Sequence, residues 1–229
     1  MPSPFACHDE FIAALVEVDL LVSVAEAHQK TPQAYATFNK ACLLFLVAKF
    51  EVFLEEAVAE YTFRLEQLRL PASNLPEVIK LHCARHLIDE HFLAALESLK
   101  PSAVDRLKQL ASLWDSDHQL DSIAIDNTFD YGKHGQGAIV KLFSRIGFED
   151  IFEACPICET EESLTGDSEA PRPVDIVADI NSVTGIRNNI LHNDATPNLT
   201  HSQISEYKQH LVLFAEKLVG VLDESLVAL

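Results

Sequence analysis

Apolar residues recur at steps of three and four along most of this chain, a spacing that is typical of helices buried on one face. The first such stripe predicts a helix over residues 9–29. Thr31 and Pro32 follow it as an N-cap residue and a first-turn proline. They predict the start of a long helix over residues 32–70, and its continuous apolar stripe makes it the expected spine of the fold.

The same period continues to the end of the chain, interrupted by prolines, a glycine stop and a polar loop over residues 115–131. Thr200 and Gln203 have the spacing of a capping box at the start of the last helix. The further helices are predicted over residues 76–99, 101–114, 135–146, 173–193 and 201–226. The sequence therefore predicts an all-α bundle of about six to seven helices in a single domain over residues 1–229.

The three longest apolar stripes belong to the helices predicted over residues 32–70, 173–193 and 201–226, so we expect these helices to pack together. Only 7 glycines in 229 residues argue against a turn-rich all-β fold. A hydrophobic fraction of 48% is that of an ordinary globular protein. Composition thus agrees with the helical periodicity.

Charge restricts the class of ligand. The chain has 17 Lys and Arg against 35 Asp and Glu, a formal net charge of −18, which argues against broad, non-specific binding to nucleic acid or anionic membranes. Residues 149–171 are rich in Asp and Glu and are predicted to form an acidic, solvated surface segment. Any polyanion has to bind to a local patch, and the one clearly basic window, without Asp or Glu, lies between positions 131 and 148.

The five cysteines do not indicate a disulfide framework, because their number is odd and three stand alone in helical-looking stretches. Cys155 and Cys158 form a lone CxxC motif, whereas a structural zinc site needs four ligands. Cys7 and His8, or a second subunit, would have to complete such a site, and unligated thiols without a metal are the favoured interpretation. With no signal peptide or membrane span predicted, we expect a cytoplasmic protein.

The candidate chemistry concentrates on the helix predicted over residues 173–193. Arg187 falls at the centre of that helix's apolar face, where an unpaired guanidinium would be costly to bury. It therefore needs a carboxylate, a partner subunit or a bound anion in front of it. Asn188 and His192 lie four residues apart on the adjoining edge. For each residue a structural role is the alternative: an internal ion pair for Arg187 and a helix cap for His192.

Arg187 and His192, separated by four residues, match the R-polar-x-x-x-H signature of HEPN ribonucleases, and they lie on the penultimate helix as in that superfamily. The resemblance is closest to proteins of the RiboL-PSP-HEPN type and covers about residues 35–220. Asn193 stands where such proteins often have glycine, which affects the helix stop more than the chemistry. The segments that carry the further resemblance are residues 41–54, with a Phe-Glu-x-Phe core, residues 127–129 and residues 139–147.

The resemblance implies an endoribonuclease that needs neither metal nor cofactor and cleaves RNA by attack of the ribose 2′-hydroxyl on the adjacent phosphate. It implies that His192 is a general acid or base, that Arg187 stabilises the charge of the transition state, and that Asn188 orients His192 or the phosphate. Glu51 resembles the acidic residue that accompanies the motif and would hold Arg187. An ordinary surface carboxylate is an equally good explanation of Glu51.

The basic window supplies our candidates for contacts with the phosphate backbone of RNA, made without reading its sequence. The alternative is a solvated basic helix paired with the acidic segment after it. The four candidates in this window are Lys133, His134, Lys141 and Arg145.

Two classes of function remain open on the sequence. The resemblance favours a ribonuclease effector, such as a toxin or an antiphage defence component, that cleaves tRNA or messenger RNA as a homodimer and is controlled by an antitoxin or defence partner. The alternative is a non-catalytic binding or dimerisation module of the same fold, for which the high acidity suits a basic partner. A purely structural bundle would leave Arg187 unexplained.

Overall fold

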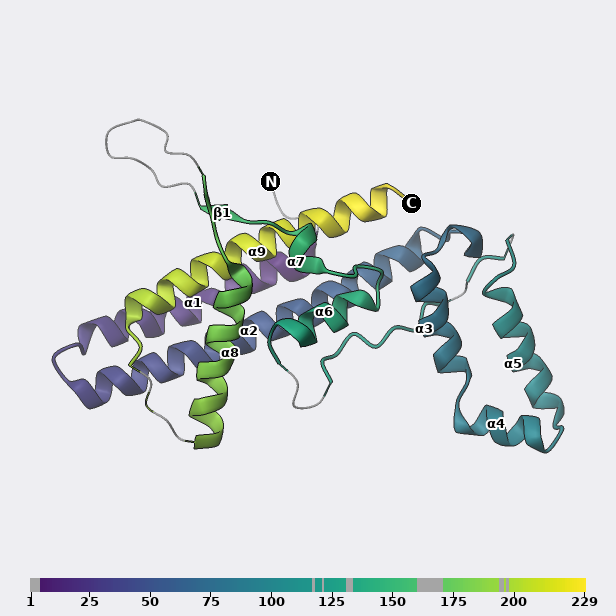
Figure 1. Cartoon of the computed structure of the whole chain (residues 1–229), viewed down its shortest axis with the longest axis horizontal. Helices are drawn as coiled ribbons and strands as arrows, with labels where there is room; N and C mark the ends of the chain where they lie inside the picture. Colours follow the sequence, from purple (N-terminus) through teal and green to yellow (C-terminus); the bar gives the residue numbers. More distant parts are fainter. Residues whose placement is uncertain are drawn as a thin grey trace.

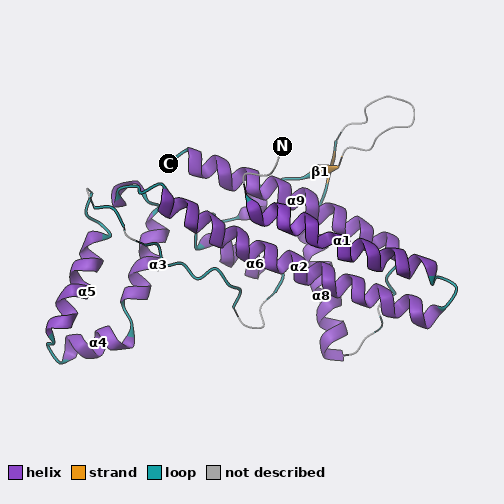
Figure 2. Ribbon diagram, turned by 180° about the vertical axis from the view of Figure 1, so that it is seen from behind, coloured by secondary structure: helices purple, strands orange, loops and turns teal. Residues whose placement is uncertain are grey.

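Long helices run side by side along the longest axis of the molecule in the computed structural model (Figure 1). The structure describes residues 5–116, 118–120, 122–130, 134–159, 171–193, 196 and 198–229. Within these residues there are nine α-helices, one short 3-10 helix and a single two-stranded ladder (Figure 2). The all-α prediction is confirmed.

The three longest helices, α1 (Ala6–Ala27), α2 (Pro32–Gln67) and α9 (His201–Val227), form the body of the fold. α8 (Ile176–Asn193) crosses this body, and α3, α4 and α5 extend from one end of it (Figure 1). The remaining elements are η1 (Ala72–Asn74), α3 (Glu77–Leu87), α4 (Glu90–Glu97), α5 (Pro101–Ser112), α6 (Gln136–Ser144), α7 (Ile151–Ala154), β1 (Cys158–Glu159) and β2 (Arg172–Pro173).

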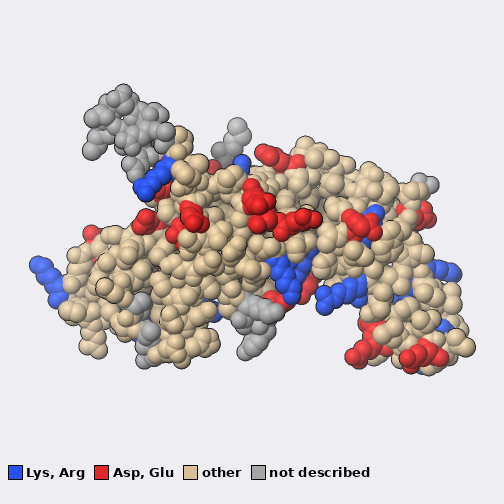
Figure 3. Space-filling view, in the orientation of Figure 1, with Lys and Arg blue, Asp and Glu red and all other residues tan. Residues whose placement is uncertain are grey.

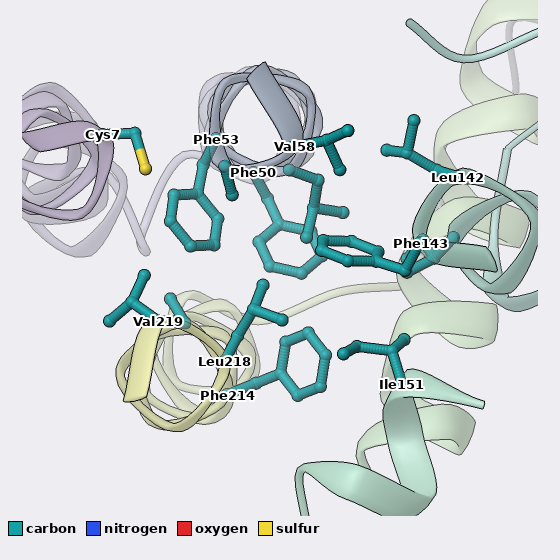
Figure 4. Close-up of a cluster of buried hydrophobic side chains, with 14 of the residues drawn as sticks. Cys7, Phe50, Phe53, Val58, Leu142, Phe143, Ile151, Phe214, Leu218 and Val219 are labelled. Atoms are coloured by element: carbon teal, nitrogen blue, oxygen red, sulfur yellow. The ribbon is translucent and has the colours of Figure 1, made fainter. Parts of the chain in front are cut away.

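The hydrophobic core surrounds α2, which packs against α1, α6, α8 and α9. Aromatic rings from α2 meet those of α9 in its centre: the centroids of Phe50 and Phe214 are 6.2 Å apart in an edge-on arrangement. Phe152 stacks on the other side of Phe214 at 5.4 Å, and Phe143 of α6 points into the same cluster (Figure 4). The expected packing of α2, α8 and α9 is confirmed, because all three pairs are in contact.

The prediction of a single helix over residues 76–99 is wrong, because the structure divides this segment into α3 and α4. The chain turns at Ile88, and the carboxylate of Asp89 caps the new helix by accepting a hydrogen bond from the backbone N–H of Phe92 at 2.6 Å. Arg106 of α5 donates to the carbonyl of Leu87 at 3.1 Å and so satisfies a group that the break leaves open. A capping Asp inside an apolar period marked this break in the sequence.

The acidic segment expected over residues 149–171 is not simply a solvated surface. Its described part, residues 149–159, forms α7 and β1 and buries Ile151, Phe152 and Cys155 in the core. Residues 160–170 lie outside the described part of the chain. The sequence interpretation weighed the carboxylates and overlooked the apolar residues between them.

The helix expected to start at Pro173 begins instead at Ile176. Pro173 pairs with Cys158 in the ladder, and the side chain of Asp175 accepts a hydrogen bond from the N–H of Ala178 at 3.0 Å. Asp175 is therefore the residue that caps α8.

His210 fixes α8 against α9. Its side chain is 9% exposed and lies between two carboxylates, with Nδ1 2.6 Å from Asp179 of α8 and Nε2 2.8 Å from Glu159 of β1. The predicted capping box of Thr200 and Gln203 is confirmed at the start of α9. Together these contacts set the direction in which α8 leaves the body of the fold.

Four of the five cysteines are buried, at positions 7, 42, 83 and 155, and only Cys158 is exposed. Burial raises the pKa of Cys7 and Cys155 to about 12 and that of Cys42 to about 11, and it also raises the pKa of Cys83. The described residues contain no group of three His, Cys, Asp or Glu side chains placed to hold a metal ion. None of the described helices is long and apolar enough to cross a membrane.

We expect Phe214→Ala to lower the free energy of unfolding by about 3–5 kcal/mol, because Phe214 is fully buried and its removal leaves a cavity between two aromatic rings. Urea denaturation followed by circular dichroism measures the change. Phe63→Ala is the matched control, since Phe63 is 59% exposed and its loss should cost less than about 1 kcal/mol. Equal losses for both variants would contradict this description of the core.

We expect one thiol per native chain to react rapidly with Ellman's reagent at pH 8. A raised pKa lowers the fraction of thiolate, which is the reactive form, and burial of the other four cysteines adds to that protection. Cys158→Ser should abolish the rapid reaction, whereas Cys42→Ser should leave it unchanged. Rapid labelling that survives Cys158→Ser would show that another cysteine is accessible.

Candidate active site

A cleft of about 690 Å³ lies between α2, α8 and the segment before α6. On α2, residues three and four apart, from Ala48 to Glu55, place their side chains along one stripe. On α8, one face of the last turns supplies the other wall. The polar groups that line the cleft are Glu51, Glu55, Asp130, His134, Arg187, Asn188 and His192. The structure thus brings the four residues predicted to be catalytic to one place.

Arg187 is the cation of this cleft, with a side chain that is 19% exposed. Its Nη1 donates a hydrogen bond to Oδ1 of Asn188 at 3.0 Å. Its Nη2 lies 3.9 Å from Oε2 of Glu51, which is an electrostatic contact too long for a hydrogen bond. Glu51 is therefore the carboxylate expected in front of Arg187 on the apolar face of its helix. The guanidinium keeps several N–H groups available for a ligand.

Glu51 also faces His134, because Nδ1 of His134 is 2.7 Å from Oε1 of Glu51. The two groups are not aligned for a hydrogen bond, so this contact is electrostatic as well. His134, a candidate for contacts with the RNA backbone, lies inside the cleft. Glu51 therefore stands between an arginine from α8 and a histidine from the segment before α6.

Asn188 and His192 have different surroundings. Asn188 accepts its hydrogen bond from Arg187, so in this structure it orients Arg187 and not His192. His192 is exposed at the end of α8 and borders the cleft. An exposed imidazole at this edge is accessible to a substrate.

The expected basic window does not form one free patch. Arg145 is 7% exposed, and its Nη1 donates to the backbone carbonyls of Asp126 and Thr128 at 2.8 and 2.6 Å. Lys141 and Arg145 also bind the carboxylate of Asp130, at 2.5 and 3.1 Å. The guanidinium of Arg145 thus holds residues 126–130 by satisfying their backbone carbonyls, and its contact with RNA stays a prediction. Lys133 lies outside the described residues.

The segment held by Arg145 forms a wall of the cleft. The backbone N–H of Phe129 donates to Oε1 of Glu55 at 2.7 Å, which ties the segment to α2. Burial acts to raise the pKa of Asp126, but hydrogen bonds from Thr128 and the charge of Arg145 outweigh it, so the pKa lies below its ordinary value. Glu55 on one side and Arg145 on the other thus fix the segment.

Sequence reasoning missed Phe129, Asp130 and the location of His134. Glu55 had a signal in the sequence, since it follows Glu51 by four residues on the same helix face. Phe129, Asp130 and His134 have no such signal, because each lies more than fifty residues from Arg187 along the chain. From its own side chains the cleft offers a cation, a carboxylate that faces it, an amide and two imidazoles, the groups needed for acid–base chemistry on an anionic substrate.

Comparison with known proteins gives one match. No curated protein and no solved structure matches the chain. The family model described as RiboL-PSP-HEPN matches residues 13–224, which include both walls of the cleft. Proteins of this family type have a nuclease or another RNA-related function. Because the match covers nearly the whole length, this chain belongs to the RiboL-PSP-HEPN family.

Proposed function

We propose that the protein is a metal-independent endoribonuclease that cleaves RNA at the cleft between α2 and α8. The observation that carries this proposal is the convergence of Arg187, His192 and His134 on one cleft, with Glu51 in contact with two of them. A guanidinium with free N–H groups suits the charge of a phosphate, and two imidazoles suit two proton transfers near neutral pH.

The reaction needs two proton transfers. One imidazole takes the proton of the ribose 2′-hydroxyl, and the oxygen attacks the adjacent phosphorus. The bond from phosphorus to the 5′-oxygen breaks, and the other imidazole protonates that oxygen as it leaves. The products are a 2′,3′-cyclic phosphate and a 5′-hydroxyl. We assign the two imidazoles to His192 and His134, because both line the cleft.

Arg187 stabilises the negative charge that develops on the phosphate oxygens. Glu51 keeps the guanidinium directed into the cleft at 3.9 Å, a separation that leaves the cation available to the phosphate. Asn188 positions Arg187 through its hydrogen bond. Glu51 and Asn188 are thus positioning residues that act through Arg187.

The acidic side chains of the cleft do not prevent an anion from binding, because each already has a partner. Asp130 binds Lys141 and Arg145, Glu55 accepts a backbone N–H, and Glu51 faces two basic side chains. Asp130 and Glu51 are compensated by the basic side chains that they contact, and the Glu55 carboxylate is held by a backbone N–H.

We further propose a homodimer in which α8 lies at or near the interface. Exposed apolar side chains border the cleft, with Val52 57% and Leu191 53% exposed, and a second subunit would cover them. The proposed substrate is tRNA or messenger RNA, in agreement with the RNA-related function of the family. The proposed role is that of a toxin or antiphage defence effector that an antitoxin or defence partner controls.

A non-catalytic binding or dimerisation module is the second candidate. One observation favours it: Arg187 already has a carboxylate of its own chain in contact, as an internal ion pair would. The cleavage assay below separates the two candidates.

We expect Arg187→Ala to lower the rate of RNA cleavage by about 10²–10³-fold through loss of charge stabilisation. His192→Ala should lower it by about 10²–10⁴-fold through loss of a proton-transfer group. A gel assay with tRNA and messenger RNA in the presence of EDTA measures both. Because the 2′-hydroxyl is the nucleophile, DNA should stay intact and the RNA products should end in a 2′,3′-cyclic phosphate.

The matched control is His91→Ala, since His91 is an exposed histidine on α4 and does not line the cleft. It should cleave at the wild-type rate, and all variants should unfold at the same urea concentration. Intact RNA after incubation with the wild-type dimer, at every pH and with candidate activators, would favour the binding module. Magnesium-dependent cleavage that survives His192→Ala would show that the motif has been misassigned.

We expect the rate to depend on pH in a bell shape, because one imidazole has to act as a base and the other as an acid in the same reaction. His134→Gln should lower the rate by about 10²-fold and remove one limb of the profile. Rates measured from pH 5 to 9 test this assignment. If the bell shape persists in His134→Gln, His134 is not one of the two proton-transfer groups and acts only through Glu51.

A further inference from the structure

A second pocket, of about 430 Å³, lies between α3 and α6. α3 contributes His82, Arg85 and His86, which are three and four residues apart and share one face of the helix. The same spacing recurs on the other side, where the pocket is lined by Lys141, Ser144 and Arg145, with Asp126 and Asp130 beside them. Two helices thus present basic faces to one enclosed space.

The acidic side chains of this pocket are engaged, whereas the basic side chains of α3 are not. Asp130 accepts hydrogen bonds from Lys141 at 2.5 Å and Arg145 at 3.1 Å, and Asp126 accepts the N–H of Thr128 at 3.1 Å. Across the part of the chain that the structure describes, the α3 side chains of the pocket have neither a hydrogen bond nor an ion pair. They are therefore available to a ligand.

The electrostatics of His82 agree with a site for an anion. Its pKa is lowered, first by burial and then by the positive charges of Arg145, Arg85 and His86, with Asp126 acting in the opposite direction. The positive charges thus outweigh the negative one at this imidazole. A bound anion would reduce that repulsion.

The position of the pocket relates it to the candidate active site. Asp130 lines both hollows, so the segment of residues 126–130 forms a wall common to them. Positively charged side chains gather over α6 and beside α3 on this face, below a row of acidic side chains over α7 and α9 (Figure 3). On a chain with a net charge of −18, a polyanion is guided to such a confined patch.

We infer that the pocket between α3 and α6 binds a phosphodiester of the RNA strand whose neighbouring nucleotides occupy the cleft of Arg187 and His192. This inference rests on the proposed function and adds to it a subsite for the RNA backbone. Arg85 is its main free cation, because the guanidinium of Arg145 is used by the backbone carbonyls of residues 126 and 128. A phosphate contact of this kind positions the strand without reading its sequence.

The test measures RNA binding separately from cleavage. A fluorescein-labelled single-stranded RNA carrying 2′-O-methyl groups lacks the nucleophile, so its fluorescence anisotropy reports binding to the active wild-type protein. We expect Arg85→Glu to weaken binding roughly tenfold, and Arg85→Gln to lower the slope of log affinity against log salt by about 0.7. Lys108→Glu is the matched control, because Lys108 is exposed on neighbouring α5 and lines neither pocket; its affinity should match that of the wild type.

Cleavage of unmodified RNA by the same variants distinguishes the failure of each proposal. If the wild type cleaves RNA but Arg85→Glu and Arg85→Gln bind and cleave as it does, the subsite is wrong and the ribonuclease proposal stands. If neither the wild type nor the variants cleave RNA but the affinity for RNA still depends on Arg85, the subsite holds and the ribonuclease proposal fails. Absence of RNA binding by the wild type overturns the subsite. Arg85-dependent binding of AMP that is tighter than that of the oligonucleotide assigns the pocket to a free nucleotide and overturns it as well.

Discussion

Burial of α2 is the constraint on which the geometry of the candidate active site depends. This one helix packs against α1, α6, α8 and α9, and its neighbours converge on the aromatic cluster around Phe50 and Phe53. Glu51 lies between these two residues in the sequence and points to the cleft instead of the core, so its position is set by the burial of Phe50 and Phe53. The long helix cannot rotate to move Glu51 without exposing Phe50 or Phe53 to water, which would cost about 1.5–3 kcal/mol for each ring.

α8 meets this fixed carboxylate at an angle that other contacts decide. His210 holds its first turns through Asp179, and Ile180 and Val183 are buried in the core. Its last turns leave the body of the fold, which leaves Arg187 partly buried and His192 exposed. Partial burial strengthens the electrostatic attraction between Arg187 and an anion, while the exposed end keeps the cleft open to a long substrate.

The distribution of positive charge suits the proposed binding of an anion by so acidic a chain. Arg145 is used within the fold, where it fixes residues 126–130 as a wall between two hollows. Arg187 faces one hollow and Arg85 the other, and neither guanidinium is saturated by hydrogen bonds in the part of the chain described. The rest of the acidic surface repels a polyanion. For the proposed RNA substrate, attraction at these two points therefore favours binding along one path over non-specific binding.

The sequence by itself determined the helical class, the long central helix, the capping box at Thr200 and the motif that contains Arg187 and His192, because periodicity, caps and motifs are local properties of the chain. It also named Glu51, through a resemblance that the family match supports. Only the tertiary structure decided that Arg145 is used internally and that His134 faces Glu51. These outcomes depend on which distant groups share a space, and since buried polar groups must find partners wherever the fold places them, no local pattern encodes the choice.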